Sequence, residues 1–351
     1  MIDAVSINRD LQKIGMKPYE RERMVSRNGG VVVIGELNVD LVASGLETVP
    51  ILGHEILAQG FQITLGSASA IFASGIRRLG HPVTFISKVG ADDFGRYCKQ
   101  ALEDLSISVD YVQVNRASMT GVTISLSTNQ DRALVTYLGA IAELKLEEVP
   151  LGILKGHRHL HMTSLFLQHA LRPSFPTIFR EARKMGLTTS FDPNSDPSQS
   201  WRPDIWDVVS QTDILFVNET EAQQLSREAD VEKALGWLGA NAPCVVIKRG
   251  SLGAMAIQHG KIAFEPGFPV QAIDTTGAGD SFAAGFIDAY MRGGDLSLCL
   301  QTGNACGAMS TLQVGGTTGQ PTQSQLANFL QERGEASDTT KVVLNSQGQE
   351  F

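Results

Sequence analysis

Short apolar runs that alternate with longer amphipathic stretches dominate the sequence from Val31 onward. The apolar runs have the length of strands and comprise Val31–Ile34, Val83–Ile86, His159–Met162, Thr188–Phe191, Ile214–Val217 and Val245–Ile247. Apolar residues at helical spacing between them predict helices at Ala68–Leu79, Phe94–Leu105, Pro173–Lys184, Glu219–Leu225 and Val231–Leu238. Continuously apolar strands separated by helices are typical of a mostly parallel sheet covered on both faces. The chain is therefore expected to adopt an α/β fold.

Two regions depart from this rhythm. Val42–Leu65 and Gly121–Tyr137 alternate apolar and polar residues, and Asn129-Gln-Asp131 provides a hairpin turn between two such strands. The pattern predicts half-exposed antiparallel strands, within about 40–65 and 119–139, that project from the main sheet. A small sheet attached to an α/β domain is expected to act as a lid over a substrate.

The two ends of the chain have a different composition. Residues 1–30 are polar, charged and weakly periodic, so they are expected to form an extension with one helical segment around Asp10–Ile14. Residues 334–351 contain few apolar residues apart from Val342–Leu344, and a loosely ordered tail is expected there. The remaining residues, 31–333, are expected to form one domain.

Composition excludes several classes of protein. A net charge of −8 and a pI near 5.4 argue against a dedicated nucleic-acid binder, which usually has a basic face. The four cysteines include no Cys-x-x-Cys pair and are expected to be reduced thiols of a cytosolic protein. No apolar stretch is long enough to span a bilayer, and the charged N-terminus does not resemble a secretory signal. A cytoplasmic protein without nucleic-acid or membrane partners is expected.

The segment Asp274-Thr-Thr-Gly-Ala-Gly-Asp280 carries the strongest functional signal. Apolar residues follow it at helical spacing, so a helix is expected to begin near Gly277–Gly279. The unpaired amides and positive end of a helix start favour an anion, and glycine lets a phosphate approach the backbone closely. Asp280 adds a carboxylate beside that anion site. The combination suits phosphoryl transfer, in which amides stabilise the transferring group and a carboxylate takes the proton of an attacking hydroxyl.

Simpler explanations and rival phosphate motifs compete with this hypothesis. A glycine-rich helix start with Asp280 as a capping residue is the structural alternative, but the full seven-residue string is more specific than a bare Gly-x-Gly. The pattern Gly-x-x-x-x-Gly-Lys-Ser/Thr does not occur. The dinucleotide fingerprint also fails, because Phe282 stands three residues after Gly279.

The same segment is similar to the C-terminal signature of the ribokinase family of carbohydrate kinases. Four further segments resemble family motifs: Gly35-Glu-Leu-Asn-Val-Asp40, Val89-Gly-Ala-Asp-Asp-Phe-Gly95, Asn218-Glu-Thr-Glu221 and Lys248-Arg-Gly-Ser-Leu-Gly253. The resemblance extends from about Val31 to Phe329. It implies a ribokinase-like three-layer α/β/α fold with a mostly parallel central sheet and a small β-sheet lid.

The resemblance also implies an activity and a set of site residues. The chain would phosphorylate a hydroxyl of a small sugar or sugar-like substrate with ATP and Mg²⁺. Asp280 would be the base, the amides of Gly277, Ala278 and Gly279 would stabilise the phosphoryl group, and Asn38, Asp40, Gly66 and Ser67 would contact the substrate. Residues expected to bind ATP are Asp192, Asn194, Asn218, Glu221, Lys248, Gly250, Gly253, Thr275, Gly277, Gly279 and Asn304.

Metal ions and an oligomer are further expectations from the resemblance. Asn218 and Glu221 would organise Mg²⁺ through water, and a monovalent cation, commonly K⁺, would lie near the carbonyls of Asp274 and Thr276. Families that look like this one commonly form homodimers through the lid. Asn218 and Glu221 also have the spacing of a helix capping box, and both roles are compatible.

One family motif is altered. The family has Gly-Gly-x-x-x-Asn at a helix start, where this chain has Gly66-Ser-Ala-Ser-Ala-Ile71. Ile71 cannot form a side-chain hydrogen bond, so the usual sugar contact is missing, and Ser67 or Ser69 is the expected substitute. A keto-acid substrate would need a cation in the pocket, for which Arg96 and Arg132 are candidates. A nucleoside kinase, a non-catalytic sugar or nucleotide sensor and, remotely, a nucleotide-dependent oxidoreductase remain as alternatives.

A row of histidines is a second unusual feature. His157, His159 and His161 alternate along one predicted strand, so the three imidazoles are expected on one face of the sheet. Three such positions seldom converge on one zinc ion without acids from elsewhere. His161 is therefore expected near the substrate pocket, with Thr163 and Ser164.

Overall fold

The computed structural model describes residues 29–128, 132–201 and 203–333. The predicted helix Asp10–Ile14, the predicted turn at residues 129–131, the tail 334–351 and nearly all of the extension 1–30 lie outside these ranges.

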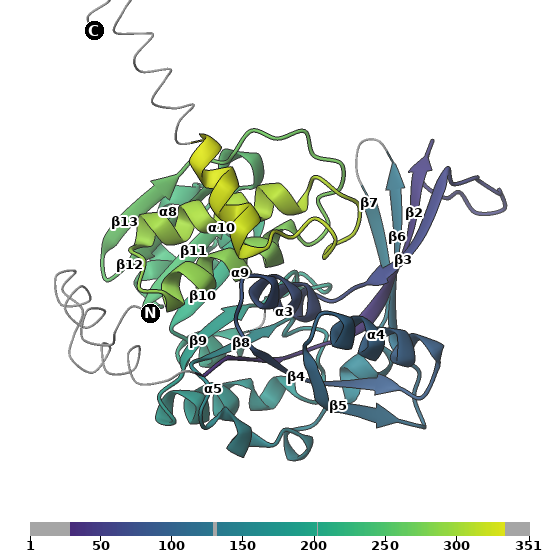
Figure 1. The fold of residues 1–351 in the computed structure, drawn as a ribbon, viewed down its shortest axis with the longest axis horizontal. Helices are drawn as coiled ribbons and strands as arrows, with labels where there is room; N and C mark the ends of the chain where they lie inside the picture. Colours follow the sequence, from purple (N-terminus) through teal and green to yellow (C-terminus); the bar gives the residue numbers. More distant parts are fainter. Residues whose placement is uncertain (1–28, 129–131, 202, 334–351) are drawn as a thin grey trace, which may run out of the picture.

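A nine-stranded sheet forms the centre of the molecule, in the order β13-β12-β11-β10-β9-β8-β1-β4-β5 (Figure 1). Neighbouring strands from β10–β11 to β4–β5 pair in parallel, and the pairs β11–β12 and β12–β13 are antiparallel. The strands are β1 (Val31–Ile34), β4 (Val83–Gly90), β5 (Ser108–Asn115), β8 (His159–Thr163), β9 (Thr188–Asp192), β10 (Ile214–Asn218), β11 (Cys244–Lys248), β12 (Ala254–Gln258) and β13 (Lys261–Glu265). The mostly parallel sheet expected from the sequence is confirmed.

All six strands predicted from apolar runs are present. Five of them are longer than predicted. β4 extends to Gly90, and β8, β9, β10 and β11 end on the polar residues Thr163, Asp192, Asn218 and Lys248. The strands β5, β12 and β13, at the two sides of the sheet, were not predicted. In β5 and β13, partial exposure replaces a continuous apolar run by mixed residues.

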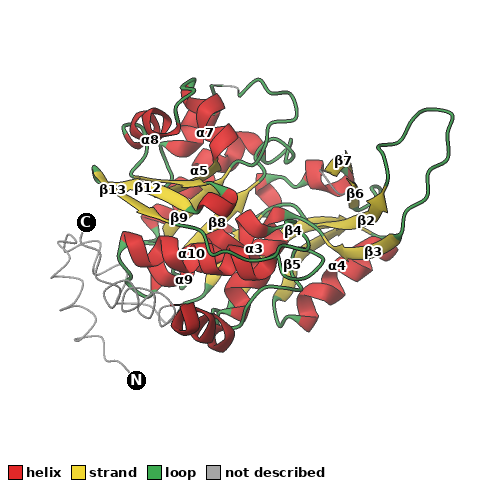
Figure 2. Ribbon diagram, turned by 90° about the horizontal axis from the view of Figure 1, so that it is seen from above, coloured by secondary structure: helices red, strands yellow, loops and turns green. Residues whose placement is uncertain are grey.

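Helices cover both faces of the sheet (Figure 2). One layer contains α3 (Ala68–Arg78), α4 (Asp93–Asp104), α9 (Ala278–Met291) and α10 (Leu296–Ser310), and the other contains α5 (Phe175–Lys184), α6 (Ile205–Val209), α7 (Glu219–Ser226) and α8 (Val231–Gly239). Successive residues of β1 point into opposite layers, with Val31 and Val33 in the first core and Val32 and Ile34 in the second. This is the predicted three-layer arrangement.

A separate four-stranded sheet, the lid, projects from the body of the molecule (Figure 1). Its order is β3 (Gly60–Leu65), β2 (Asn38–Leu46), β6 (Gly121–Thr128) and β7 (Arg132–Tyr137). β2 pairs with β6 in parallel, whereas the other pairs of this sheet are antiparallel. The expectation of purely antiparallel strands was therefore wrong for this pair, because a long connection rather than a hairpin joins the two strands.

The two faces of the lid differ in chemistry. One row across the sheet, at Leu41, Ile63, Ile124 and Val135, is apolar, and the adjacent row, at Asp40, Thr64, Thr123 and Thr136, is polar. Since neighbouring residues of a strand point to opposite faces, the lid has one apolar and one polar face. The polar face is turned toward the body, where Thr64 lies against Gly315.

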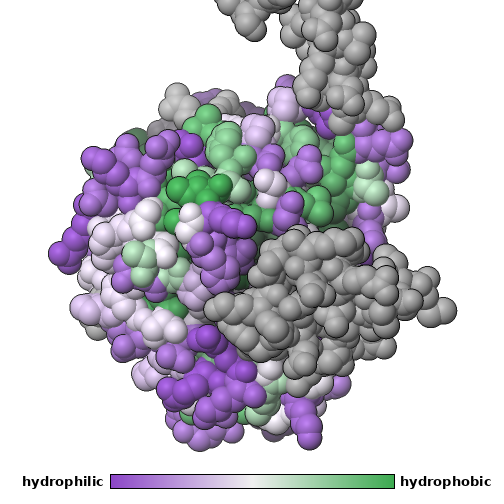
Figure 3. All heavy atoms as spheres, turned by 90° about the vertical axis from the view of Figure 1, so that its left-hand side faces the viewer, coloured by the Kyte–Doolittle hydropathy of each residue, from purple (hydrophilic) through white to green (hydrophobic). Residues whose placement is uncertain are grey.

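The surface at the β13 side of the molecule mixes apolar and hydrophilic side chains (Figure 3). Ile262 and Phe264 of β13 are among the exposed apolar residues. Among the described residues, no helix is both long and apolar enough to cross a membrane.

Candidate active site

The predicted helix start at Gly277–Gly279 is confirmed. Gly277 is the N-cap of α9 with a φ of +71°, in the left-handed region that favours glycine, and Ala278 is the first helical residue. No side chain caps this terminus. The first-turn amides therefore remain available for an anion, and Asp280 stands in the same turn.

A buried ammonium group links the start of α9 to the ends of two strands. Lys248, at the end of β11, places its Nζ 2.5 Å from Oδ2 of Asp192, at the end of β9. A Cβ atom on Gly279 would lie only 3.2 Å from the same Nζ. The sequence predicted Lys248, Asp192 and Gly279 as separate nucleotide contacts, and the structure brings them together.

The carboxylates around Lys248 have shifted pKa values. Burial raises the pKa of Asp280 well above its usual range; Lys248 lowers it, and Asp192 raises it further. Burial, together with the charge of Asp192, raises the pKa of Glu221 to about 7. Burial disfavours the charged form of Lys248, but the negative charges of Asp192 and Glu221 outweigh the effect of burial and raise the pKa of Lys248. Three carboxyl groups thus share one ammonium, and the raised pKa values of Glu221 and Asp280 show that their charged forms are disfavoured in this arrangement.

Asn218 and Glu221 form the predicted capping box at the start of α7. The Glu221 amide donates to the Asn218 side chain at 2.8 Å, and the Asn218 amide donates to Glu221 Oε2 at 2.9 Å. Ser195 also donates to Glu221 Oε1 at 3.4 Å. Glu221 also interacts electrostatically with Lys248 and Asp280. Its role in the capping box is therefore compatible with a role in the phosphate site.

Asn38 and Asp40 lie on the polar face of the lid. Asn38 Nδ2 donates to Asp40 Oδ1 at 3.0 Å and to Thr123 Oγ1 at 3.3 Å. Burial raises the pKa of Asp40 to about 6, against the effect of the Asn38 hydrogen bond. A Cβ atom on Gly66 would lie 2.1 Å from Asp40 Oδ1, so this position needs glycine. The structure thus brings together three of the residues predicted to contact the substrate.

Ser67 has a positive φ, in the region of backbone conformation that favours glycine. Its φ is +78°, and its hydroxyl donates to the Glu36 carbonyl at 2.6 Å and accepts from the Ala70 amide at 3.0 Å. These two hydrogen bonds offset a strained conformation, which typically costs about 1–3 kcal/mol. Because the hydroxyl is already partnered on both sides, it is not a ready substitute for the missing asparagine amide.

Ser69 is not a ready substitute either. Its hydroxyl donates to Glu36 Oε2 at 2.8 Å and contacts Thr163 Oγ1 at 2.6 Å, and the residue is fully buried. Glu36 also accepts from the Ser164 hydroxyl, which in turn accepts from Asn194 Nδ2. Glu36 was not among the predicted site residues, although Thr163 and Ser164 at the end of the neighbouring strand were a signal.

Ile71, at the position of the family asparagine, packs against the backbone of the phosphate segment. It is 3% exposed, and a Cβ atom on Gly277 would lie 2.9 Å from its Cγ2. Gly316 has a similarly close contact with Ile71 Cδ1. The side chain at this position is therefore buried and apolar, with no hydrogen-bonding group.

The predicted ATP-binding residues outside the Lys248 cluster have clear backbone roles. Gly253 has a φ of +98°, and a Cβ atom there would meet the Glu265 carbonyl at 2.1 Å. Asn304 donates to the carbonyls of Glu265 and Pro266 and so fixes the same turn. Gly250 has a φ of +57° with open space around it. Thr275, by contrast, contributes its carbonyl to the Ala278 amide rather than a side-chain contact.

Of the two candidate cations, only Arg132 reaches the site. Its Nη1 donates to Thr276 Oγ1 at 2.5 Å, which joins lid strand β7 to the phosphate segment. Arg96 instead pairs with Asp93 on the surface of α4. Asp274 accepts from the amides of Thr276 and Gly315, and although burial opposes it, these hydrogen bonds lower its pKa.

Two of the three histidines, His159 and His161, belong to the core, whereas His157 precedes β8 and is half-buried. His159 bonds to Thr188 and Ser190, and His161 bonds to Ser190 and stacks on Phe72 with ring centroids 3.6 Å apart. Both rings are buried, and burial lowers the pKa of each. Within the described ranges, no cluster of three or more His, Cys, Asp or Glu residues could hold a metal ion. The expected placement of His161 in the substrate pocket was wrong, because its partners lie inside the sheet layer.

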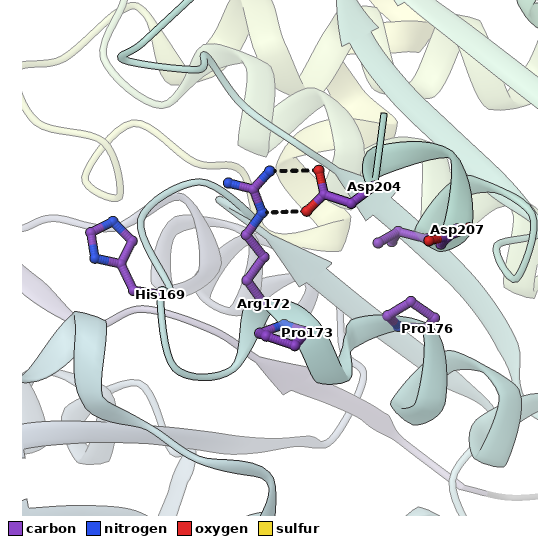
Figure 4. Close-up of a pocket in the computed structure, with 7 residues that line it drawn as sticks. His169, Arg172, Pro173, Pro176, Asp204 and Asp207 are labelled. Atoms are coloured by element: carbon purple, nitrogen blue, oxygen red, sulfur yellow. Dashed lines mark hydrogen bonds and ion pairs between the residues drawn. The ribbon is translucent and has the colours of Figure 1, made fainter. Parts of the chain in front are cut away.

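A surface hollow lies apart from these residues, between α5 and α6 (Figure 4). Arg172 and Asp204 face each other across it in a bidentate ion pair, with nitrogen–oxygen distances of 2.9 and 2.8 Å. The Arg172 guanidinium also lies 4.8 Å from the centre of the Phe166 ring. None of the residues that line the hollow belongs to the candidate active site, and the ion pair connects the loop before α5 to the start of α6.

The fold and the site together define a phosphotransferase, with a phosphate-binding helix start, a buried carboxylate beside it and a lid opposite. Residues 28–323 match the pfkB family of carbohydrate kinases, and the chain belongs to this family.

Individual relatives differ in their substrates. The chain is 30% identical to an ATP-dependent ribose-1-phosphate kinase of Halopiger xanaduensis, with 86% of this chain and 98% of the relative covered. It is 31% identical to a 2-dehydro-3-deoxygluconokinase of Bacillus subtilis, with 79% and 89% covered. A solved structure of a putative ribokinase II from E. coli, in complex with ATP and Mg²⁺, superposes with a TM-score of 0.77 at 28% identity and covers 87% of this chain and 99% of its own.

Proposed function

We propose that this carbohydrate kinase transfers the γ-phosphoryl group of ATP to a hydroxyl of a small sugar or sugar-like acceptor. The observation that carries the proposal is the position of Asp280 in the uncapped first turn of α9, beside the ammonium of Lys248. A carboxylate with a raised pKa is a stronger base than an ordinary one, and the neighbouring amides are suited to a phosphoryl group.

Each group has a defined task in this proposal. The Asp280 carboxylate takes the proton of the acceptor hydroxyl. The hydroxyl oxygen of the acceptor bonds to the γ-phosphorus, and the bond between that phosphorus and the oxygen of ADP breaks. The amides at Gly277–Gly279 and the ammonium of Lys248 stabilise the negative charge on the transferring group. Asn38 and Asp40 orient the acceptor from the lid.

No group of three or more acidic, histidine or cysteine side chains in the described ranges could hold a metal ion directly, so the site suits a magnesium ion that arrives with ATP and keeps its waters. Asp192, Glu221 and Asp280 outnumber the single ammonium, and burial has raised the pKa of both Glu221 and Asp280. Asn218 and Glu221 would hold Mg²⁺ through water, and the ion would supply charge neutralisation of the phosphates. K⁺ is proposed beside the backbone of Asp274 and Thr276, where the lowered pKa of Asp274 keeps a carboxylate charged.

The test is an ADP-release assay with ATP, Mg²⁺ and K⁺ across ribose, fructose, ribose 1-phosphate, 2-dehydro-3-deoxygluconate and nucleosides. Turnover of one acceptor is expected, with loss of about 10²–10⁴-fold in Asp280→Asn while ATP binding persists. Ligand-induced stabilisation without turnover of any acceptor would instead favour a non-catalytic sensor. Turnover of nucleosides alone would identify a nucleoside kinase.

We also propose that the apolar face of the lid is the interface of a homodimer. The exposed side chains of this face come from β3, β6 and β7. They are Phe61, Ile63, Ile124, Val135 and Tyr137. A contiguous exposed apolar face is typical of an interaction surface, and a second copy offers a complementary one. Light scattering should give a dimer, and Val135→Glu should give a monomer.

Two coarser assignments accompany this proposal. Residues 31–333 are proposed as the limits of the kinase domain, because β1 begins at Val31 and the described helical turns end at Arg333. A cytoplasmic location is proposed from the substrate class and from the four buried thiols. Fractionation of cells that express the full chain checks the location.

A further inference from the structure

Arg132 is the residue whose position the transfer reaction does not explain. It is the first described residue of β7, at the outer part of the lid, yet its guanidinium reaches the body and donates to Thr276 Oγ1 at 2.5 Å. Phosphoryl transfer already has a cation, since Lys248 lies beside Gly279 and influences Asp280. The positive charge of Arg132 is therefore expected to have a role other than stabilising the transferring phosphoryl group.

The register of the lid places Arg132 on the substrate-facing side. Arg132 pairs with Ser127, and Thr136, four residues further on, pairs with Thr123 in the polar row that contains Asp40. Residues an even number of positions apart share one face, so Arg132 projects from the same face as Asp40. Its side chain runs back along that face toward the body.

The charge of Arg132 acts on the acceptor side of the site. It lowers the pKa of Asp40 and contributes to lowering that of Asp274. The main influences on Asp280 are instead burial, Lys248, Asp192, Glu36 and Glu221. The site thus has two positive centres, one on the side of the ATP phosphates and one on the side where Asp40 meets the acceptor.

We propose that the acceptor is an anionic sugar, a sugar phosphate or a sugar acid, whose phosphate or carboxylate is bound by Arg132. This inference rests on the proposed kinase function and specifies its substrate class. Guanidinium groups bind carboxylates and phosphates in a bidentate manner, and an arginine on a lid binds that group as the lid covers the acceptor. Ile71, which is buried and has no side-chain hydrogen bond to offer, makes this anchor more important, because the asparagine contact of related sites is absent.

The experiment compares matched acceptors with and without an anionic group, in the assay with ATP and Mg²⁺. Ribose 1-phosphate is paired with methyl riboside, and 2-dehydro-3-deoxygluconate with its methyl ester, so the two pairs separate a phosphate from a carboxylate. The charged member of one pair is expected to have a kcat/KM at least about 10-fold above its neutral partner. Arg132→Gln should lower kcat/KM of that charged acceptor by about 10–100-fold, mainly through KM, since a charge-assisted hydrogen bond contributes about 1.5–3 kcal/mol. In Arg132→Gln, kcat/KM of the neutral partner should change by less than about 3-fold. In Arg132→Lys, kcat/KM of the charged acceptor should lie between the values of the wild type and Arg132→Gln.

Two controls separate an anion site from a simple lid latch. Thr276→Val removes the hydroxyl partner of Arg132 but keeps the charge, so it is expected to change both members of a pair by the same factor. Arg96→Gln removes an arginine that pairs with Asp93 on α4, and it should change neither.

Two results would overturn the inference. One is a preference for neutral acceptors in both pairs, and the other is an equal loss for charged and neutral acceptors in Arg132→Gln. Absence of ADP release with every acceptor would count against the kinase proposal itself, so the two failures are distinguishable.

Discussion

Ile71 lies directly against Gly277, so that a side chain on the glycine would have to share space with the isoleucine. A Cβ atom there would stand 2.9 Å from Ile71 Cγ2, at a backbone φ of +71°. Gly279, two residues later, has no positive φ, and the nearest atom to a Cβ at that position would be the end of a flexible lysine, at 3.2 Å. The two glycines of the phosphate segment are therefore not equivalent.

Gly277→Ala is expected to damage the enzyme more than Gly279→Ala. The first substitution combines a left-handed conformation with a clash, and it should lower the free energy of unfolding by about 1–3 kcal/mol and reduce kcat strongly. The second should leave stability nearly unchanged, because Lys248 can shift its ammonium. Thermal denaturation and ADP-release rates of the two variants check this order; equal losses would contradict it.

Asp280→Asn should stabilise the protein while it lowers turnover by about 10²–10⁴-fold. Burial raises the pKa of Asp280, so its ionised form is penalised in the folded state. An asparagine removes this penalty, and a gain of about 1–2 kcal/mol is expected at neutral pH. A carboxyl whose pKa is raised on folding has no effect on stability below its unfolded pKa, near 3.8, and destabilises the fold increasingly as the pH rises from there toward the folded pKa. The gain in melting temperature should therefore be present at pH 8 and vanish below about pH 4, where both states are protonated.

Lys248→Gln should shift the pH dependence of kcat/KM. Lys248 lowers the pKa of Asp280, so its removal raises that pKa further and moves the acid limb of the profile to higher pH. A lower kcat at every pH is also expected, because the transferring group loses a cation. Lys88→Gln is the matched control: Lys88 is buried and pairs with Glu148 at 2.6 Å, outside the candidate site. It should reduce stability without moving the acid limb.

The sequence predicted the central sheet well because burial on both faces leaves an unambiguous pattern. Every strand predicted as an apolar run is present, whereas β5, β12 and β13, at the two sides of the sheet, were missed. The parallel pairing of β2 and β6 was also not foreseen, since alternation indicates a half-exposed strand and not the direction of its partner.

Residues of the candidate site could be proposed where they belong to a local sequence motif. Contacts between residues far apart in the sequence could not be predicted. Gly277, Asp280, Asn218 and Glu221 could be proposed from local spacing, which also produced the capping box. The hydrogen bond of the Ser67 hydroxyl could not be predicted, because its partner is the carbonyl of Glu36, 31 residues away. Likewise, only the structure separates Arg132 from Arg96.

Asp92→Asn should loosen the connection between the lid and the body. The Asp92 carboxylate caps α4 through the Gly95 amide at 2.8 Å and also accepts from the Thr120 amide at 2.8 Å and the Thr120 hydroxyl at 2.6 Å, immediately before lid strand β6. An asparagine has one acceptor oxygen, so at least one of these hydrogen bonds is lost and stability should fall by about 1–3 kcal/mol. KM for the acceptor should rise more than KM for ATP, because Thr120 leads into the lid.

The pH dependence gives the Asp92 prediction a second readout. Burial acts in the other direction, but the hydrogen bonds from Thr120 and Gly95 prevail and lower the pKa of Asp92 below its usual value. A carboxyl whose pKa is lowered on folding stabilises the protein above its unfolded pKa, near 3.8, and loses this effect as the pH falls through the folded pKa. The difference in melting temperature between wild type and Asp92→Asn should therefore be full at about pH 6 and shrink below about pH 4. Asp93→Asn, at an exposed neighbour that pairs with Arg96, should change stability by less than about 0.5 kcal/mol at either pH. A pH-independent difference, or an equal effect of the two substitutions, would show that the Asp92 carboxylate does not hold the lid to the body.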